Sequence, residues 1–174
     1  MEEKEVIPFS YRICTFSSSF NIENVVNNLK KSKERKISTQ ILNPALIVSK
    51  RHLALAIHHT LKSFKVKKNI ARDNSTEFLI RISGRRQISK ALDLYGITHD
   101  STNVLVLVFG GTEKENNESL SDFIQTMGLE ELEKEKQKLP ISSLEILTEF
   151  YDCSKKPDDL EKKALELMAI IDVQ

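Results

Sequence analysis

The residues best suited to chemistry in this chain are two adjacent arginines, Arg85 and Arg86, which have no obvious nucleophile beside them. Apolar residues alternate with others over Phe78–Ser83, a period that predicts a strand, and Gly84 then allows a turn. An amphipathic helix is expected next, ending in a left-handed cap at Gly96. The arginines would therefore lie between a strand and a helix N-terminus, where backbone N–H groups favour anions. Such a turn is suited to holding an anion rather than to breaking bonds.

The neighbours of the two arginines indicate a nucleic-acid ligand. Guanidinium groups grip phosphate oxygens in bidentate fashion, and Arg81 on the predicted strand would add a third. Gln87 carries a donor and an acceptor for a base edge or a ribose, and Ile88 offers an apolar surface for a base. The competing interpretation is a solvent-exposed turn whose arginines pair with nearby carboxylates.

Charge is distributed unevenly along the chain. Residues 1–90 hold 18 Lys and Arg against 7 Asp and Glu, a net charge of +11, whereas residues 91–174 hold 8 against 18, a net charge of −10. A basic half favours contact with phosphate groups, and an acidic half avoids them or meets a basic partner. Both sets can also be ordinary solvated surface, because halves of a sequence need not be halves in space.

The other reactive side chains do not form a recognisable catalytic or metal site. His58 and His59 are adjacent, so on a helix they would point about 100° apart and could not chelate one ion. Cys14 and Cys153 are isolated, and carboxylates such as Glu130 lie in runs typical of a solvated helix face. No GxSxG, GxxxxGK[ST] or GxGxxG motif occurs. We therefore expect no catalytic residue, no metal and no cofactor.

The order of predicted elements favours a mixed α+β fold. We expect a small mixed or antiparallel sheet of three to five strands flanked by helices, with a helical C-terminal part. The length suits a single domain over residues 1–174, strand-rich over 1–110 and helical over 111–174. No run reaches the roughly 18 apolar residues of a membrane span, and the acidic start does not resemble a signal peptide. A cytoplasmic protein without membrane contact is expected.

Further elements are predicted from periodicity and capping residues. Strands are expected at residues 11–16 and, as a central buried strand, at 104–109. Residues 39–48 are expected to form two short extended pieces with a bend, or an edge strand, because Pro44 removes a backbone donor. Helices are expected after Asn21 and Ser49, over 119–127 and 129–138, from a capping box at Ser142 and from Pro157.

The last predicted helix carries more apolar residues than one buried face requires. Leu160, Ala164, Leu167 and Ile171 form one stripe, and Leu165, Met168, Ala169 and Ile170 widen it. A surplus apolar face on a terminal helix is a candidate partner surface. The alternative is a terminal helix that is simply well buried.

Three segments resemble the kinase-binding subunit of the KEOPS complex, the PRPK-binding protein family. These are ILNPALIVSKRHLALAIHHTL, NSTEFLIRISGRRQISKALDLYGI and the VLVLVF strand. The form RISGRRQI is similar to the archaeal branch, whereas eukaryotic members lack the basic turn. The resemblance covers roughly residues 40–110, together with the terminal helix by position and character; residues 112–158 match no part of the family pattern.

This resemblance implies a regulatory function and two surfaces. Members are non-catalytic proteins that bind and stimulate the small atypical kinase/ATPase of KEOPS and, through it, join the threonylcarbamoyltransferase subunit in making threonylcarbamoyl-adenosine on tRNA. The C-terminal helix contacts the kinase, which carries over to Leu160, Leu167, Met168, Ile170 and Ile171. Archaeal members engage the 3′ CCA end of tRNA, which carries over to Arg81, Arg85, Arg86, Gln87 and Ile88, with Lys67, Lys68 and Arg72 as further candidates.

Two alternatives stay open. A stand-alone RNA-binding protein would need no kinase, and a small hydrolase would need a deep pocket of convergent titratable groups. Neither alternative predicts the wide apolar stripe on the terminal helix.

Overall fold

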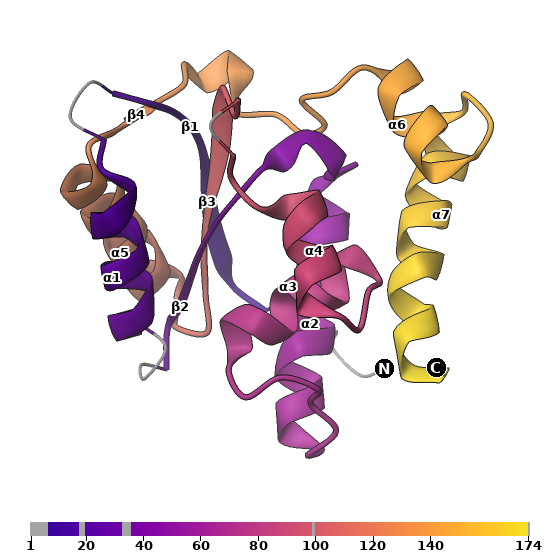
Figure 1. The fold of residues 1–174 in the computed structure, drawn as a ribbon, viewed down its shortest axis with the longest axis horizontal. Helices are drawn as coiled ribbons and strands as arrows, with labels where there is room; N and C mark the ends of the chain where they lie inside the picture. Colours follow the sequence, from indigo (N-terminus) through magenta and orange to yellow (C-terminus); the bar gives the residue numbers. More distant parts are fainter. Residues whose placement is uncertain (1–6, 18–19, 33–35, 99, 174) are drawn as a thin grey trace.

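Helices cover both faces of a four-stranded antiparallel sheet in the computed structural model, which describes residues 7–17, 20–32, 36–98 and 100–173 (Figure 1). The strands are β1 (Phe9–Phe16), β2 (Ser38–Leu42), β3 (Asn103–Phe109) and β4 (Leu129–Glu131), in the order β2-β3-β1-β4. The expected α+β class is confirmed, and of the two sheet types expected, mixed or antiparallel, the sheet is antiparallel.

The central strand is β3, which pairs with β1 on one side and β2 on the other. Residues 104–109 are all fully buried, as their continuous apolar run predicts. Side chains alternate between two cores: Leu105, Leu107 and Phe109 face one, and Val104, Val106 and Val108 face the other. The strand therefore has no solvent-facing side.

Two helices cover one face of the sheet. These are α1 (Ile22–Ser32) and α5 (Glu113–Met127), which close the core around Val106 (Figure 1). The Asn21 side chain accepts hydrogen bonds from the N–H groups of Glu23 and Asn24, so the helix start expected there is confirmed.

The opposite face is covered by three helices, α2 (Lys50–Lys65), α3 (Asn74–Ser83) and α4 (Ile88–Tyr95). Ser49 caps α2 as expected, because its side chain accepts from the N–H of His52. Before it, β2 confirms the edge strand that was one of the two expectations for this segment, and the second extended piece is replaced by the 3₁₀ turn Pro44–Leu46.

A further helical pair, α6 (Leu144–Tyr151) and α7 (Pro157–Ile170), packs outside α2 and α3 (Figure 1). Its core joins Val48, Leu147, Tyr151, Leu160 and Ala164. After α7, a 3₁₀ turn over Ile171–Val173 brings the chain back toward α3. Among the described residues, no helix has both the length and the apolar character needed to cross a bilayer.

The predicted strand over Phe78–Ser83 is wrong, because these residues form most of α3. Asp73 caps this helix by accepting from the N–H of Thr76, and Gly84 ends it with a φ of 64°. Every residue from Glu77 to Ser83 is buried. A helix whose residues are buried on every side lacks the polar face that reveals a helical period in the sequence. The polar residues Arg81 and Ser83 are two positions apart, which is also the spacing of residues on one side of a strand.

Three further predictions of secondary structure are also wrong, two about how a helix begins or ends and one about the type of element. Gly96 has an extended φ of −69° rather than a left-handed cap. The stretch expected to be helical over 129–138 contains β4 and a 3₁₀ turn over Lys134–Lys136, because the left-handed Gly128 ends α5 and turns the chain toward β1. Ser143 rather than Ser142 caps α6.

The outer edge of β2 is covered by the start of α3. The Gln40 side chain donates to the carbonyl of Ser75, and the Ser75 hydroxyl donates to the carbonyl of Thr39 at 3.5 Å. All five residues of β2 are buried. This edge strand is therefore closed by a helix rather than left open to solvent.

His52 is a fully buried histidine at the start of α2. Its Nδ1 atom accepts from the N–H of Val48 at 3.5 Å, while Nε2 makes no hydrogen bond of ordinary geometry. Burial lowers the pKa of His52 to about 4, against the raising influence of the Ile82 backbone and the Glu161 carboxylate. The ring is therefore neutral in the folded protein at neutral pH.

Folding stability should depend on pH through this residue. Between pH 6.5 and about 4, His52 is protonated in the unfolded chain but neutral in the folded protein. The free energy of unfolding therefore falls as the pH falls through this window. We expect a loss of about 3 kcal/mol in the free energy of unfolding, measured by urea titration at each pH. His52→Leu should remove most of this slope, whereas His58→Gln, at an exposed site, should keep it. A full slope in His52→Leu would contradict the assignment.

Candidate binding surfaces at the basic turn and the C-terminal helix

The basic turn connects α3 to α4 and consists of residues 84–87. Arg85, Arg86, Gln87 and the first helical residue, Ile88, are all exposed. Gln87 precedes α4 without making a side-chain capping bond, so its amide is available to a ligand. The structure therefore brings these four predicted residues together at a helix N-terminus, although a helix rather than a strand leads into the turn.

This turn lies directly against the C-terminal helix. A Cβ atom built on Gly84 would lie 2.7 Å from the backbone oxygen of Leu167, so only glycine fits this approach. The Nη1 atom of Arg86 donates to the carbonyl of Ile171 at 3.0 Å. The two predicted surfaces, separated by some 80 residues in sequence, are thus neighbours.

Arg81 does not belong to the exposed part of this surface. It is 2% exposed, and its Nη2 atom lies 2.8 Å from Oε1 of Glu77 while Nη1 pairs with Asp172. Burial alone would lower the pKa of Arg81, but hydrogen bonds to Asp172 and Glu77 outweigh it and raise the pKa. The side chain points inward because α3 is helical, and its guanidinium is committed to two carboxylates.

Glu77 is the fully buried centre of this arrangement. Its Oε1 atom accepts from Nε of Arg81 at 2.8 Å and from the Ser63 hydroxyl at 3.2 Å. Its Oε2 atom accepts from the N–H groups of Ile70 and Ala71 at 2.8 and 2.7 Å. A buried carboxylate with this many donors has its hydrogen-bonding capacity met. We call Glu77, Arg81 and Asp172 the ion-pair network.

The other predicted cations, Lys67, Lys68 and Arg72, are exposed but lie at the opposite end of α3. This helix is 10 residues long, so its rise of ~1.5 Å per residue places the two basic regions about 15 Å apart. The structure therefore does not join them to the basic turn in one compact site.

Two charged residues at these surfaces were not predicted from the sequence. Lys90 is exposed in the first turn of α4, two residues after Ile88. Asp172 is 91 residues from its partner Arg81. The position of Lys90 just after the basic turn in the sequence could have identified it, whereas no local pattern reveals Asp172.

The residues expected to contact a kinase divide into a buried and an exposed set. Leu160, Met168 and Ile171 are at most 3% exposed, and Leu167 is half-buried against Gly84. Their stripe is wide because α7 packs against α2, α3 and α6. Ile170, at 42% exposure, is the accessible member, and Val173, which was not predicted, is 83% exposed.

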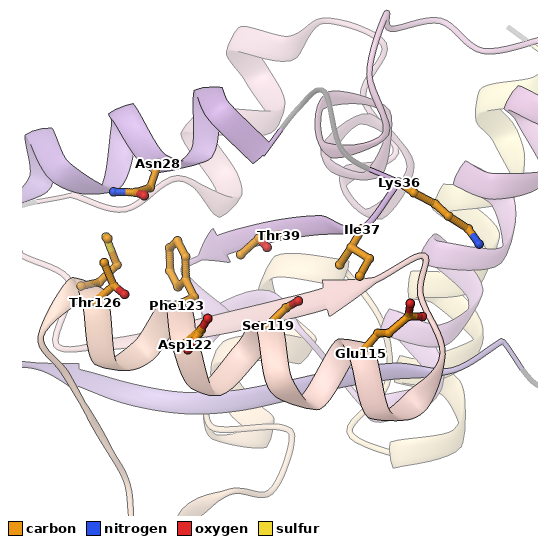
Figure 2. Close-up of a pocket in the computed structure, with 10 residues that line it drawn as sticks. Asn28, Lys36, Ile37, Thr39, Glu115, Ser119, Asp122, Phe123 and Thr126 are labelled. Carbon is orange, nitrogen blue, oxygen red and sulfur yellow. The ribbon is translucent and has the colours of Figure 1, made fainter.

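A cleft of about 380 Å³ lies between α1 and α5 above β2 (Figure 2). Apolar side chains such as Phe123 line it beside the acidic Glu115 and Asp122. Glu115 completes a capping box with Thr112, whose backbone and side-chain hydrogen bonds lower the pKa of the carboxyl. A carboxylate held ionised in this way is not poised as a general acid.

No group of three or more His, Cys, Asp and Glu side chains in the described ranges is arranged to hold a metal ion. His58 is exposed, and His59 lies with its Nδ1 atom 3.7 Å from Oδ2 of Asp172. Cys14 is buried in the sheet, where burial raises the pKa of its thiol to about 12.

An exposed basic turn beside an exposed apolar helix end is a combination typical of proteins that bind other macromolecules. The chain matches the family model described as kinase binding protein CGI-121 over residues 17–172. It belongs to this family.

A curated relative is the EKC/KEOPS complex subunit CGI121 of Candida albicans (strain SC5314 / ATCC MYA-2876). The two sequences are 29% identical over 106 residues, which cover 58% of this chain and 52% of the relative. The chain thus matches about half the length of this curated relative.

Breaking the ion-pair network from one side should destabilise the fold. Arg81→Met leaves the charge of Glu77 buried without its cation, and we expect a loss of about 3–5 kcal/mol in the free energy of unfolding. Arg81→Met combined with Glu77→Gln should recover part of this loss, because glutamine still accepts from Ile70 and Ala71 without a charge. Urea unfolding of both variants measures the difference in their free energies of unfolding. Equal free energies for the single and the double variant would contradict the network.

Proposed function

We propose that this chain is a non-catalytic regulatory subunit of a KEOPS complex. In this function it binds and stimulates the small atypical kinase/ATPase subunit and helps to recruit tRNA for threonylcarbamoyl-adenosine modification. The match to the kinase-binding family over residues 17–172 carries the proposal. The name of the Candida relative as a KEOPS subunit supports it.

The basic turn is the proposed tRNA contact. Arg85 and Arg86 supply exposed guanidinium groups, and Gln87 and Ile88 supply an amide and an apolar side chain for an unstacked base. Lys90 adds a further charge on the same helix start. Single-stranded ends such as a 3′ CCA terminus present both phosphates and free bases, which suits this mixture of groups.

Arg81 takes no direct part in the proposed contact, because both carboxylate partners occupy its guanidinium. Lys67, Lys68 and Arg72 would serve only as a second, more distant contact along the tRNA, given their place at the far end of α3.

The exposed end of α7 is the proposed kinase contact. Ile170 and Val173 present apolar side chains to solvent, and Leu167 is accessible in part. Leu160, Met168 and Ile171 support this surface from the core instead of touching the partner. Apolar side chains on one helix end, backed by a rigid core, match helix-mediated recognition.

Reversing the charge of the basic turn should weaken tRNA binding far more than kinase binding. For Arg85→Glu combined with Arg86→Glu we expect tRNA affinity to fall by about tenfold or more. The slope of affinity against salt should become shallower by about one for each phosphate that the variant no longer neutralises. Fluorescence anisotropy over a salt series measures both quantities.

The matched control for this prediction is Lys134→Glu combined with Lys138→Glu. These two exposed lysines lie between β4 and α6, so they test the same change of net charge at another place. An equal fall in tRNA affinity in the control would mean that binding follows net charge rather than the basic turn. Unchanged affinity in the arginine variant would refute the tRNA contact.

An aspartate at the exposed end of α7 should disrupt kinase binding. We expect Ile170→Asp to reduce affinity for the KEOPS kinase subunit by about tenfold or more, because the partner would bury an uncompensated charge. Val26→Asp on α1, where Val26 is 44% exposed, is the control and should bind normally. Isothermal titration calorimetry distinguishes them, and full affinity in a folded Ile170→Asp protein would exclude this surface.

A further inference from the structure

The last turn of the chain is connected to the basic turn by side-chain contacts at two successive residues. Ile171 supplies its carbonyl to Nη1 of Arg86 at 3.0 Å. Asp172 supplies Oδ1 to Arg81 and, with Oδ2, lies 3.7 Å from Nδ1 of His59. Both arginines lie on or beside α3, so one short segment is held by α2, α3 and the basic turn together.

The contact with Ile171 defines where the guanidinium of Arg86 lies. Only Nη1 is used, while the side chain as a whole stays exposed. The remaining N–H donors of this planar group are thereby held in one orientation toward solvent. An arginine that is already oriented loses less conformational entropy when it binds an anion.

The ion-pair network helps to hold the segment that contains Ile171, whose side chain is also anchored by complete burial. Asp172, about half exposed, joins this segment to the buried Arg81. Arg81 cannot shift, because Glu77 fixes it from the other side and is itself fully buried. Glu77 therefore holds Arg81, Arg81 holds Asp172, and the segment that contains Asp172 and Ile171 holds Arg86.

The same segment adjoins the apolar residues offered to a protein partner. Ile170 directly precedes Ile171, and Val173 directly follows Asp172. A partner that covers Ile170 and Val173 would hold the final turn in place. A ligand that orders a segment lowers the entropic cost for a second ligand that uses the same order.

We propose that Asp172 and Arg81 are positioning residues for the basic turn, and that they make RNA binding and kinase binding mutually reinforcing. This inference rests on the proposed function, since it assigns a linkage between its two ligands. Neither residue touches the RNA; each acts through the placement of Arg86.

The linkage is tested first on the unmodified protein. The probes are a tRNA transcript and a single-stranded oligonucleotide ending in CCA, each titrated with and without saturating kinase subunit at fixed salt. We expect kinase to increase RNA affinity by about fivefold or more, and RNA to increase kinase affinity by the same factor, because coupling between two ligands is reciprocal. To exclude direct contact between kinase and tRNA, the short oligonucleotide must show the effect as well.

The role of Asp172 is tested by Asp172→Asn, for which charge and positioning predict opposite signs. Removing a negative charge near arginines should strengthen RNA binding if electrostatics alone mattered. Positioning predicts weaker binding by about threefold or more and loss of the effect of kinase. The control is Asp93→Asn on α4, an exposed acid near the basic turn, which should bind RNA equally or more tightly.

Folding is separated from positioning by a second variant. Asp172→Glu keeps the carboxylate and should restore both RNA affinity and the effect of kinase, with urea unfolding showing that each variant is folded. If the unmodified protein binds neither ligand, the proposed function fails. If it binds both but kinase leaves RNA affinity unchanged, or Asp172→Asn binds RNA as tightly as Asp93→Asn, the inference alone is overturned.

Discussion

The buried carboxylate of Glu77 is the constraint on which the helical half of the fold depends. Placing an ionised group in the core is costly unless it is fully hydrogen-bonded, and here donors come from α2, α3 and the loop between them. The orientation of α3 against α2 follows from these bonds as well as from apolar packing. Through Arg81 the same constraint reaches Asp172, so one charge in the interior is linked to the 3₁₀ turn that follows α7.

Sequence patterns predicted the central strand better than the buried helix α3. The run over residues 104–109 predicts one arrangement, because a continuous apolar strand must be covered on both faces. The local sequence of α3 does not determine its arrangement in this way. Glu77 and Arg81 pair with each other inside the helix, but each also has a partner elsewhere in the chain, Ser63 and Asp172 respectively. Neither the helical class of α3 nor the inward direction of Arg81 therefore follows from its own period.

The candidate site shows the same division between local and distant information. Arg85, Arg86, Gln87 and Ile88 are adjacent in sequence and exposed at one turn, so reasoning along the chain placed them together correctly. In the sequence, α7 has more apolar residues than one buried face needs, because the sequence alone does not show how many helices pack around it. With α2, α3 and α6 around it, most of its apolar stripe is core, and a single turn at the end of the helix is left for a partner.

The closure of β2 by α3 limits the kinds of assembly open to the protein. Many proteins recognise peptides or copies of themselves by adding a strand to an exposed sheet edge. Here Gln40, Ser75 and the chain around Thr39 use that edge internally. Recognition at this side of the molecule is therefore left to helix faces and turns, whose side chains discriminate between partners more selectively than a row of backbone groups, and the molecule is protected from growing into sheet-like aggregates through β2.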